Sequence, residues 1–203
     1  MIKFKCLVSM LFIAFSISVN SQEKTSVNRV ISFVPQYIIK KGIRVDFERD
    51  LAGSNRLLLG PQLYLSEKNN SDDYYIDEDE YNLLFGAGIV ALVKNFRNNP
   101  EELGLYLGYG VRYNFFSIKY DELDSEGRYE VNSTIHKTGV DLILGHQMLF
   151  FDFLSIDMYT GFGIRYSLFN TEGESVDKFN SGVLDYNATG NVLLLGLRIG
   201  LKY

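Results

Sequence analysis

The chain has 203 residues with 20 basic and 25 acidic side chains, and its net charge of −5 argues against nucleic acid as a partner. Its single cysteine, Cys6, excludes an internal disulfide and a multi-thiolate metal site. Beyond residue 21 no run of about 18 apolar residues occurs, which excludes a transmembrane helix and leaves a closed barrel as the remaining structure that spans a membrane.

Residues 1–21 have the pattern of a cleaved secretory signal peptide. Lys3 and Lys5 precede an uncharged run of 14 residues, and small residues end the segment. An uncleaved membrane helix needs roughly 20 apolar residues. We therefore expect a signal peptide over 1–21 and one mature domain over 22–203, in which 18 basic and 25 acidic side chains leave a net charge of −7.

Alternating hydrophobicity recurs in eight segments of the mature chain. This period of two residues predicts β-strands with two chemically different faces. An even number of strands suits an antiparallel barrel built from hairpins. The predicted strands are 28–37, 42–50, 55–66, 81–94, 103–117, 132–148, 153–168 and 190–203.

Each predicted strand carries large apolar residues on one face and small or charged residues on the other. In the second strand, Ile43 and Phe47 lie opposite Arg44 and Asp46. The interior of an eight-stranded barrel has room only for side chains, so we expect the glycine-rich, charged face inside and the apolar face outside. A soluble ligand-holding barrel would have the opposite arrangement, and it is the alternative on this point.

The predicted connections differ in length in a regular way. Those at 67–80, 118–131 and 169–189 are long, polar and acidic, whereas those at 51–54 and 149–152 are tight turns. Outer-membrane barrels have short periplasmic turns and long external loops. The pattern predicts a bacterial outer-membrane location with both termini in the periplasm. The short first connection, 38–41, is an exception, because this orientation places it outside.

With these features the mature chain resembles the small eight-stranded outer-membrane barrels of the OmpA transmembrane domain and OmpX-like superfamily. The segment Ile31–Leu65, with its Lys-Lys-Gly hairpin, looks like the first hairpins of uncharacterised members. The resemblance implies an all-β, eight-stranded antiparallel up-and-down transmembrane barrel that the outer-membrane assembly machinery inserts. In this superfamily that machinery recognises a C-terminal strand ending in an aromatic residue, which in this chain comprises Leu197, Ile199, Leu201 and Tyr203.

Ten charged residues fall on the face that we expect inside. Their mixed signs suggest ion pairs, and we expect Asp157 to meet Arg198 and Arg112 to meet Asp141. Such pairs would form a structural plug; a narrow polar conduit is the alternative, although eight strands leave little free space. The ten residues are Arg44, Asp46, Glu48, Lys94, Arg112, Asp141, Asp157, Arg165, Arg198 and Lys202.

Two features leave alternatives open. His136 and Thr138 share a face near the outer end of the sixth strand, in the manner of the His and Ser that lipid A deacylases use, but no Glu occupies a matching strand position. The connection 67–80 holds seven acids and one lysine, so a divalent cation could bridge it to lipid phosphates, although no EF-hand spacing is present.

Together these features predict a non-enzymatic, monomeric barrel without cofactors that serves envelope integrity or surface contact. We expect contact with outer-membrane lipid and lipopolysaccharide along the wall. A protein or glycan could bind the external loops, which include Tyr74, Tyr75, Tyr129, Phe179 and Tyr186. The alternative function is a lipid-modifying enzyme of the lipid A deacylase type that uses His136 and Thr138.

Overall fold

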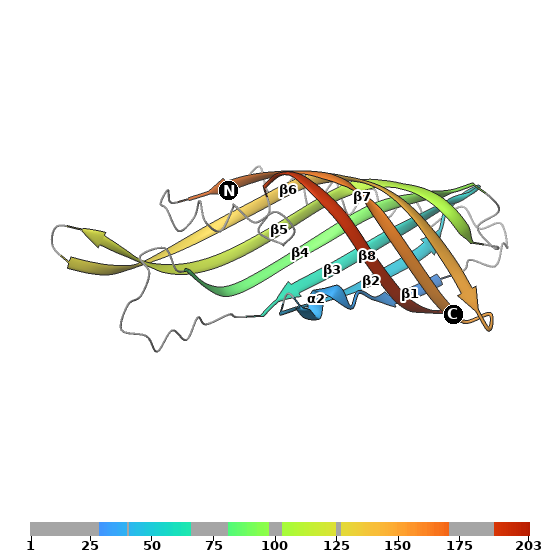
Figure 1. The fold of residues 1–203 in the computed structure, drawn as a ribbon, viewed down its shortest axis with the longest axis horizontal. Helices are drawn as coiled ribbons and strands as arrows, with labels where there is room; N and C mark the ends of the chain where they lie inside the picture. Colours follow the sequence, from blue (N-terminus) through green and yellow to red (C-terminus); the bar gives the residue numbers. More distant parts are fainter. Residues whose placement is uncertain (1–28, 40, 66–80, 98–102, 125–126, 171–188) are drawn as a thin grey trace.

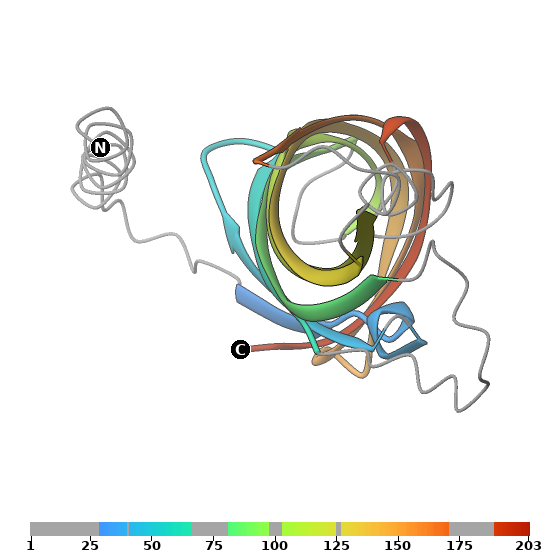
Figure 2. The same ribbon diagram turned by 90° about the vertical axis from the view of Figure 1, so that its left-hand side faces the viewer.

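Eight antiparallel strands, each hydrogen-bonded to its neighbours in the sequence, close into a barrel in the computed structural model (Figure 1). The structure describes residues 29–39, 41–65, 81–97, 103–124, 127–170 and 189–203. The predicted signal peptide, the connection 67–80 and most of the connection 169–189 lie outside these residues. The strands form a closed ring when viewed end-on (Figure 2), so the expected all-β, eight-stranded antiparallel barrel is confirmed.

The strands become longer towards the middle of the chain. One short helix, α2, follows the first strand. Among the described residues, no helix has the length and hydropathy of a membrane-spanning segment. The elements are β1 (Arg29–Phe33), α2 (Gln36–Ile39), β2 (Gly42–Asp50), β3 (Asn55–Tyr64), β4 (Tyr81–Phe96), β5 (Gly104–Asp124), β6 (Gly127–Phe150), β7 (Leu154–Phe169) and β8 (Gly190–Lys202).

The first strand is shorter than its hydrophobic pattern predicts. It ends at Phe33 instead of residue 37, and the chain turns into α2. Pro35 explains the end of the strand, because proline has no N–H to donate to a neighbouring strand. The turn sends the ring of Tyr37 into the barrel, where it is buried against Tyr64.

The prediction of a loop over 118–131 is wrong, because most of these residues belong to β-strands. β5 continues to Asp124 and β6 begins at Gly127, so the two strands form a hairpin that extends beyond the other strands (Figure 1). The sequence pattern misses this extension because both faces of a two-stranded ribbon are exposed, and no apolar face is required there. An exposed ion pair between Lys119 and Glu130 joins its two strands.

The two faces of the wall have the allocation that the sequence predicts. Ile43 and Leu107 are 48% and 47% exposed on the outside, whereas Arg44 and Arg198 are 1% and 2% exposed in the lumen. Gly108 is buried on the inner face. The apolar residues therefore cover the exterior of the barrel, and the charged and small residues fill its interior.

The barrel closes through a short pairing between its terminal strands. Val30–Phe33 of β1 pairs with Ile199–Lys202 of β8, and the backbone N–H of Tyr203 donates to the carbonyl of Arg29. Where this pairing ends, the side chain of Gln36 in α2 forms hydrogen bonds with β7 and β8. Its Oε1 accepts from the N–H of Leu197 at 3.4 Å, and its Nε2 donates to the hydroxyl of Tyr159 at 3.3 Å.

Glycines on the inner face make room for two tyrosine rings. A Cβ at Gly145 would lie 2.3 Å from the ring of Tyr106, and one at Gly196 would lie 2.2 Å from the ring of Tyr159. These distances are too short for any side chain, so each glycine makes room for the ring of the tyrosine paired with it on the adjacent strand. The recurrence of glycine on the inner face therefore reflects the limited volume of the lumen.

Candidate functional site

One part of the lumen holds a continuous set of ion pairs. Nζ of Lys94 lies 2.6 Å from Oε1 of Glu48 and 2.8 Å from Oδ2 of Asp157. Asp157 also receives Nη1 of Arg198 at 2.7 Å, and Nε of Arg198 donates to Oδ2 of Asp46 at 2.7 Å. Because side chains from β2, β4, β7 and β8 meet here, this cluster ties opposite walls of the barrel together.

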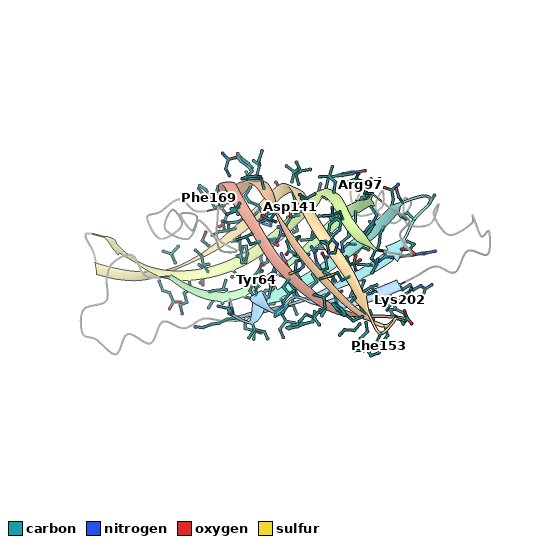
Figure 3. The ribbon with its side chains drawn as sticks, turned by 45° about the vertical axis from the view of Figure 1, so that its right-hand side comes forward. Tyr64, Arg97, Asp141, Phe153, Phe169 and Lys202 are labelled. Atoms are coloured by element: carbon teal, nitrogen blue, oxygen red, sulfur yellow. The ribbon has the colours of Figure 1, made fainter. Side chains whose placement is uncertain are left out.

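A second group of charges lies around the hydroxyl of Tyr37 in α2. Arg44 binds both carboxylate oxygens of Asp46, through Nε at 2.6 Å and Nη2 at 2.9 Å. On the far wall, Asp141 receives Nη2 of Arg112 at 3.1 Å and Nη2 of Arg165 at 2.5 Å. Asp141, which is labelled in Figure 3, is buried on the inner face of β6.

In this second group, Tyr37 of α2 connects Arg44 of β2 with Arg112 of β5. Its hydroxyl accepts from Nη1 of Arg112 at 3.0 Å and from Nη1 of Arg44 at 3.3 Å, and it donates to Oε1 of Gln62 at 2.8 Å. Gln62 in turn donates to Oδ1 of Asn114. One tyrosine hydroxyl thus holds two guanidinium groups that have no carboxylate in common.

The structure brings together nine of the ten charged residues that the sequence places inside. Asp157 and Arg198 are directly opposite in the pairing of β7 and β8. Arg112 and Asp141 are not opposite, since Asp141 pairs with Gly110, but the long arginine side chain still reaches the carboxylate. Lys202 lies apart from these clusters, at the end of the barrel that also carries Phe153 (Figure 3).

Several residues of the network were missed. Arg56 contacts Asp50 at 2.6 Å and Glu48 at 3.7 Å, and buried Lys137 lies 3.1 Å from the hydroxyl of Thr189. Their position could have been found from strand parity, because Arg56 alternates with the outward residues of β3 and Lys137 shares the face of Asp141. Tyr37 could not have been found that way, because it lies outside the strands.

The ion pairs give every lumen carboxylate named above a basic partner, and the basic side chains outnumber the acidic ones. Among the described residues, the carboxylates of both clusters each contact at least one guanidinium or ammonium group. A hydroxyl of Tyr106 adds a donor to Asp157 at 2.7 Å. Charged side chains that each have several partners inside a closed barrel fix the strands in position. Their mutual contacts also occupy the polar atoms that a substrate would need.

The outer wall carries the other residues singled out in the sequence. His136 and Thr138 face outwards on β6, and Nδ1 of His136 lies 2.7 Å from the hydroxyl of Tyr113. In a catalytic triad an acidic group would orient the histidine, and in the described part of the chain a tyrosine hydroxyl makes this contact. Leu197, Ile199, Leu201 and Tyr203 also lie on the outward face of β8.

The chain is similar in fold to solved β-barrel proteins. A major outer membrane protein from Thermus thermophilus is 15% identical, with a TM-score of 0.48 over 87% of this chain and 97% of that one. The N-terminal β-barrel domain of Pseudomonas aeruginosa OprF is 12% identical, with a TM-score of 0.41 over 88% and 98% of the two chains. Acinetobacter baumannii CarO is 13% identical, with a TM-score of 0.38 over 87% and 96%. No family model and no curated protein sequence matches the chain.

Proposed function

We propose that this protein is an integral barrel of the bacterial outer membrane that acts without catalysis, as a structural element of the envelope or as a surface for contact. The observation that carries this proposal is the allocation of side chains, with an apolar exterior around an ion-paired interior. A soluble protein rarely exposes a continuous apolar surface of this extent. In a bilayer the same surface faces hydrocarbon, and the closed strand order leaves no open sheet edge over most of the wall.

The shape of the barrel supports an orientation with both termini in the periplasm. The tight turn between β2 and β3 and that between β6 and β7 lie at one end, together with the end of β8. The extension of β5 and β6 projects from the opposite end (Figure 1). This matches the short periplasmic turns and long external segments of outer-membrane barrels. A monomer inserted by the outer-membrane assembly machinery, with Tyr203 directly after the terminal strand β8, completes the proposal.

Extraction and gel migration test the membrane assignment. We expect the protein to stay with the membrane fraction in high salt and alkaline carbonate, and to require detergent for release. We also expect the unheated protein to migrate differently from the boiled protein in a denaturing gel, because the ion-paired barrel resists unfolding by the detergent. Release into aqueous buffer without detergent would instead indicate a soluble barrel.

The filled lumen leads to a second expectation, for conductance. Purified protein in planar bilayers should show no stable ion channels, because Lys94, Asp157 and Arg198 cross the lumen and their charges are compensated. A porin examined in the same bilayers is the positive control. Well-resolved channels of uniform conductance would contradict the structural role and favour a polar conduit.

A further inference from the structure

The outer wall of β5, β6 and β7 changes from apolar to polar within a few rows of residues. Val111, Val140 and Ile164 form one apolar row across the three strands. The next row towards the extension of β5 and β6 is Tyr113, Thr138 and Tyr166, followed by Phe115, His136 and Leu168. The row beyond contains Ser117 and Thr134. In a membrane barrel this transition marks the height of the lipid headgroups.

His136 has a defined orientation in this transition zone. The hydroxyl of Tyr113 lies 2.7 Å from its Nδ1, and the ring of Phe115 packs edge-on against the imidazole at 5.3 Å between centroids. Both neighbours belong to β5, so the ring is held from one side. When the hydroxyl donates to Nδ1, the proton of the neutral imidazole resides on Nε2. Among the described residues, no side chain is hydrogen-bonded to that nitrogen.

Two further hydroxyl groups lie on the same outer face, in the row next to His136. Thr138 is exposed two residues along β6, and the ring of Tyr166, opposite Thr138 on β7, is 63% exposed. Lys119 lies further along β5 on the outer face, where it pairs with Glu130. The surface therefore offers hydroxyl groups near the oriented imidazole, in rows that the proposed membrane location puts at the level of the outer-leaflet phosphates.

We propose that His136, oriented by Tyr113, binds a phosphate group of lipopolysaccharide on the outer wall of the barrel. This inference rests on the proposed location in the outer membrane. The N–H at Nε2 of His136 donates to a phosphate oxygen, and the hydroxyl groups of Thr138 and Tyr166 supply further donors. A hydrogen bond from imidazole to phosphate is strengthened by the charge of the phosphate. The site is a binding surface and needs no nucleophile.

The two histidines of the chain allow a direct test. Protein with ¹⁵N-labelled histidine gives two pairs of imidazole signals, Nδ1 and Nε2 of each ring, in maltoside micelles, which contain no phosphate. We expect titration with lipopolysaccharide to shift the Nε2 signal of His136 in a saturable manner and to leave His146 unchanged. His146 is a matched control because it faces outwards on the same strand, between Leu105 and Met158.

Two variants separate the site from a general effect of lipid. Tyr113→Phe removes the hydroxyl that orients His136, and we expect about tenfold weaker lipopolysaccharide binding from the loss of this contact. Tyr109→Phe, on the same face of β5 but in the apolar region, is expected to bind normally. Folding of each variant is checked by heat-dependent gel migration. The extraction test described above measures the membrane assignment separately, so its failure is distinguished from a failure of the site.

Three results would overturn the proposal. Equal shifts of His136 and His146 would indicate a change of micelle environment. Equal responses to lipopolysaccharide and to dephosphorylated lipopolysaccharide would show that phosphate is not recognised. A response to phosphatidylglycerol as strong as that to lipopolysaccharide would show that the site does not select this lipid.

Discussion

Replacing Asp46 with asparagine is expected to lower the free energy of unfolding by about 3–5 kcal/mol, the usual cost of leaving a buried charge without its partner. Asp46 is fully buried and accepts three hydrogen bonds, two from Arg44 and one from Arg198. Asparagine keeps the shape of the side chain but removes its charge. Equilibrium unfolding in urea, with the protein inserted in phosphatidylcholine vesicles, measures the change.

Two further variants identify the cause of this loss. Glu130→Gln removes the acid of the exposed pair with Lys119, and we expect a loss below about 1 kcal/mol. Adding Arg44→Met to Asp46→Asn should restore part of the lost stability, because Arg198 retains Asp157 at 2.7 Å. If Asp46→Asn costs no more than Glu130→Gln, the lumen is hydrated and the ion pairs do not hold the barrel together.

Replacing Leu142 with arginine is expected to cost about 2–4 kcal/mol in a bilayer, the range for a basic residue at the lipid-facing midplane of a barrel. Leu142 faces outwards in the middle of β6, in a row with Tyr109 and Phe162, and is 54% exposed. A charge there must leave water for hydrocarbon. Unfolding in vesicles and the yield of the folded, heat-modifiable form measure the effect.

The matched control for this substitution is Thr134→Arg. Thr134 faces outwards on the same strand, in the polar row beyond His136, where a charge can remain hydrated. We expect a cost of about 0–1 kcal/mol at this level. If Leu142→Arg is as well tolerated as Thr134→Arg, the apolar wall does not face lipid, and the soluble barrel becomes the better explanation.

Strand β2 illustrates what alternation alone can predict. Its bounds, its two faces and the buried positions of Arg44, Asp46 and Glu48 agree with the sequence pattern. The pattern is informative because a wall one residue thick separates two different environments, so every second residue must suit the same one. The same reasoning applies to β8, where Leu197 and Arg198 face opposite sides.

Segment 34–39 shows where this reasoning fails. Tyr37 has the same parity as the apolar residues Ile31 and Phe33, and this alternation predicts a longer first strand with Tyr37 on the outer face. In the structure Pro35 ends the strand, and Tyr37 reaches a lumen site formed by Arg44, Arg112 and Gln62. A hydroxyl that joins side chains from three other strands is decided by packing in space, which local periodicity does not contain.

The sequence by itself determined the eight-stranded barrel, the apolar exterior and the charged interior, because strand parity and the small volume of the lumen act on each strand separately. Strand parity also predicted two ion pairs, Asp157 with Arg198 and Arg112 with Asp141, and only the tertiary structure decided the other contacts and their geometry. Strand register and side-chain direction decide three of these contacts. They are the contact of Arg112 with Asp141 across an offset register, the position of Lys94 between Glu48 and Asp157, and the contact of Tyr113 with His136. Those two properties are set when all eight strands close together, so no single segment encodes them.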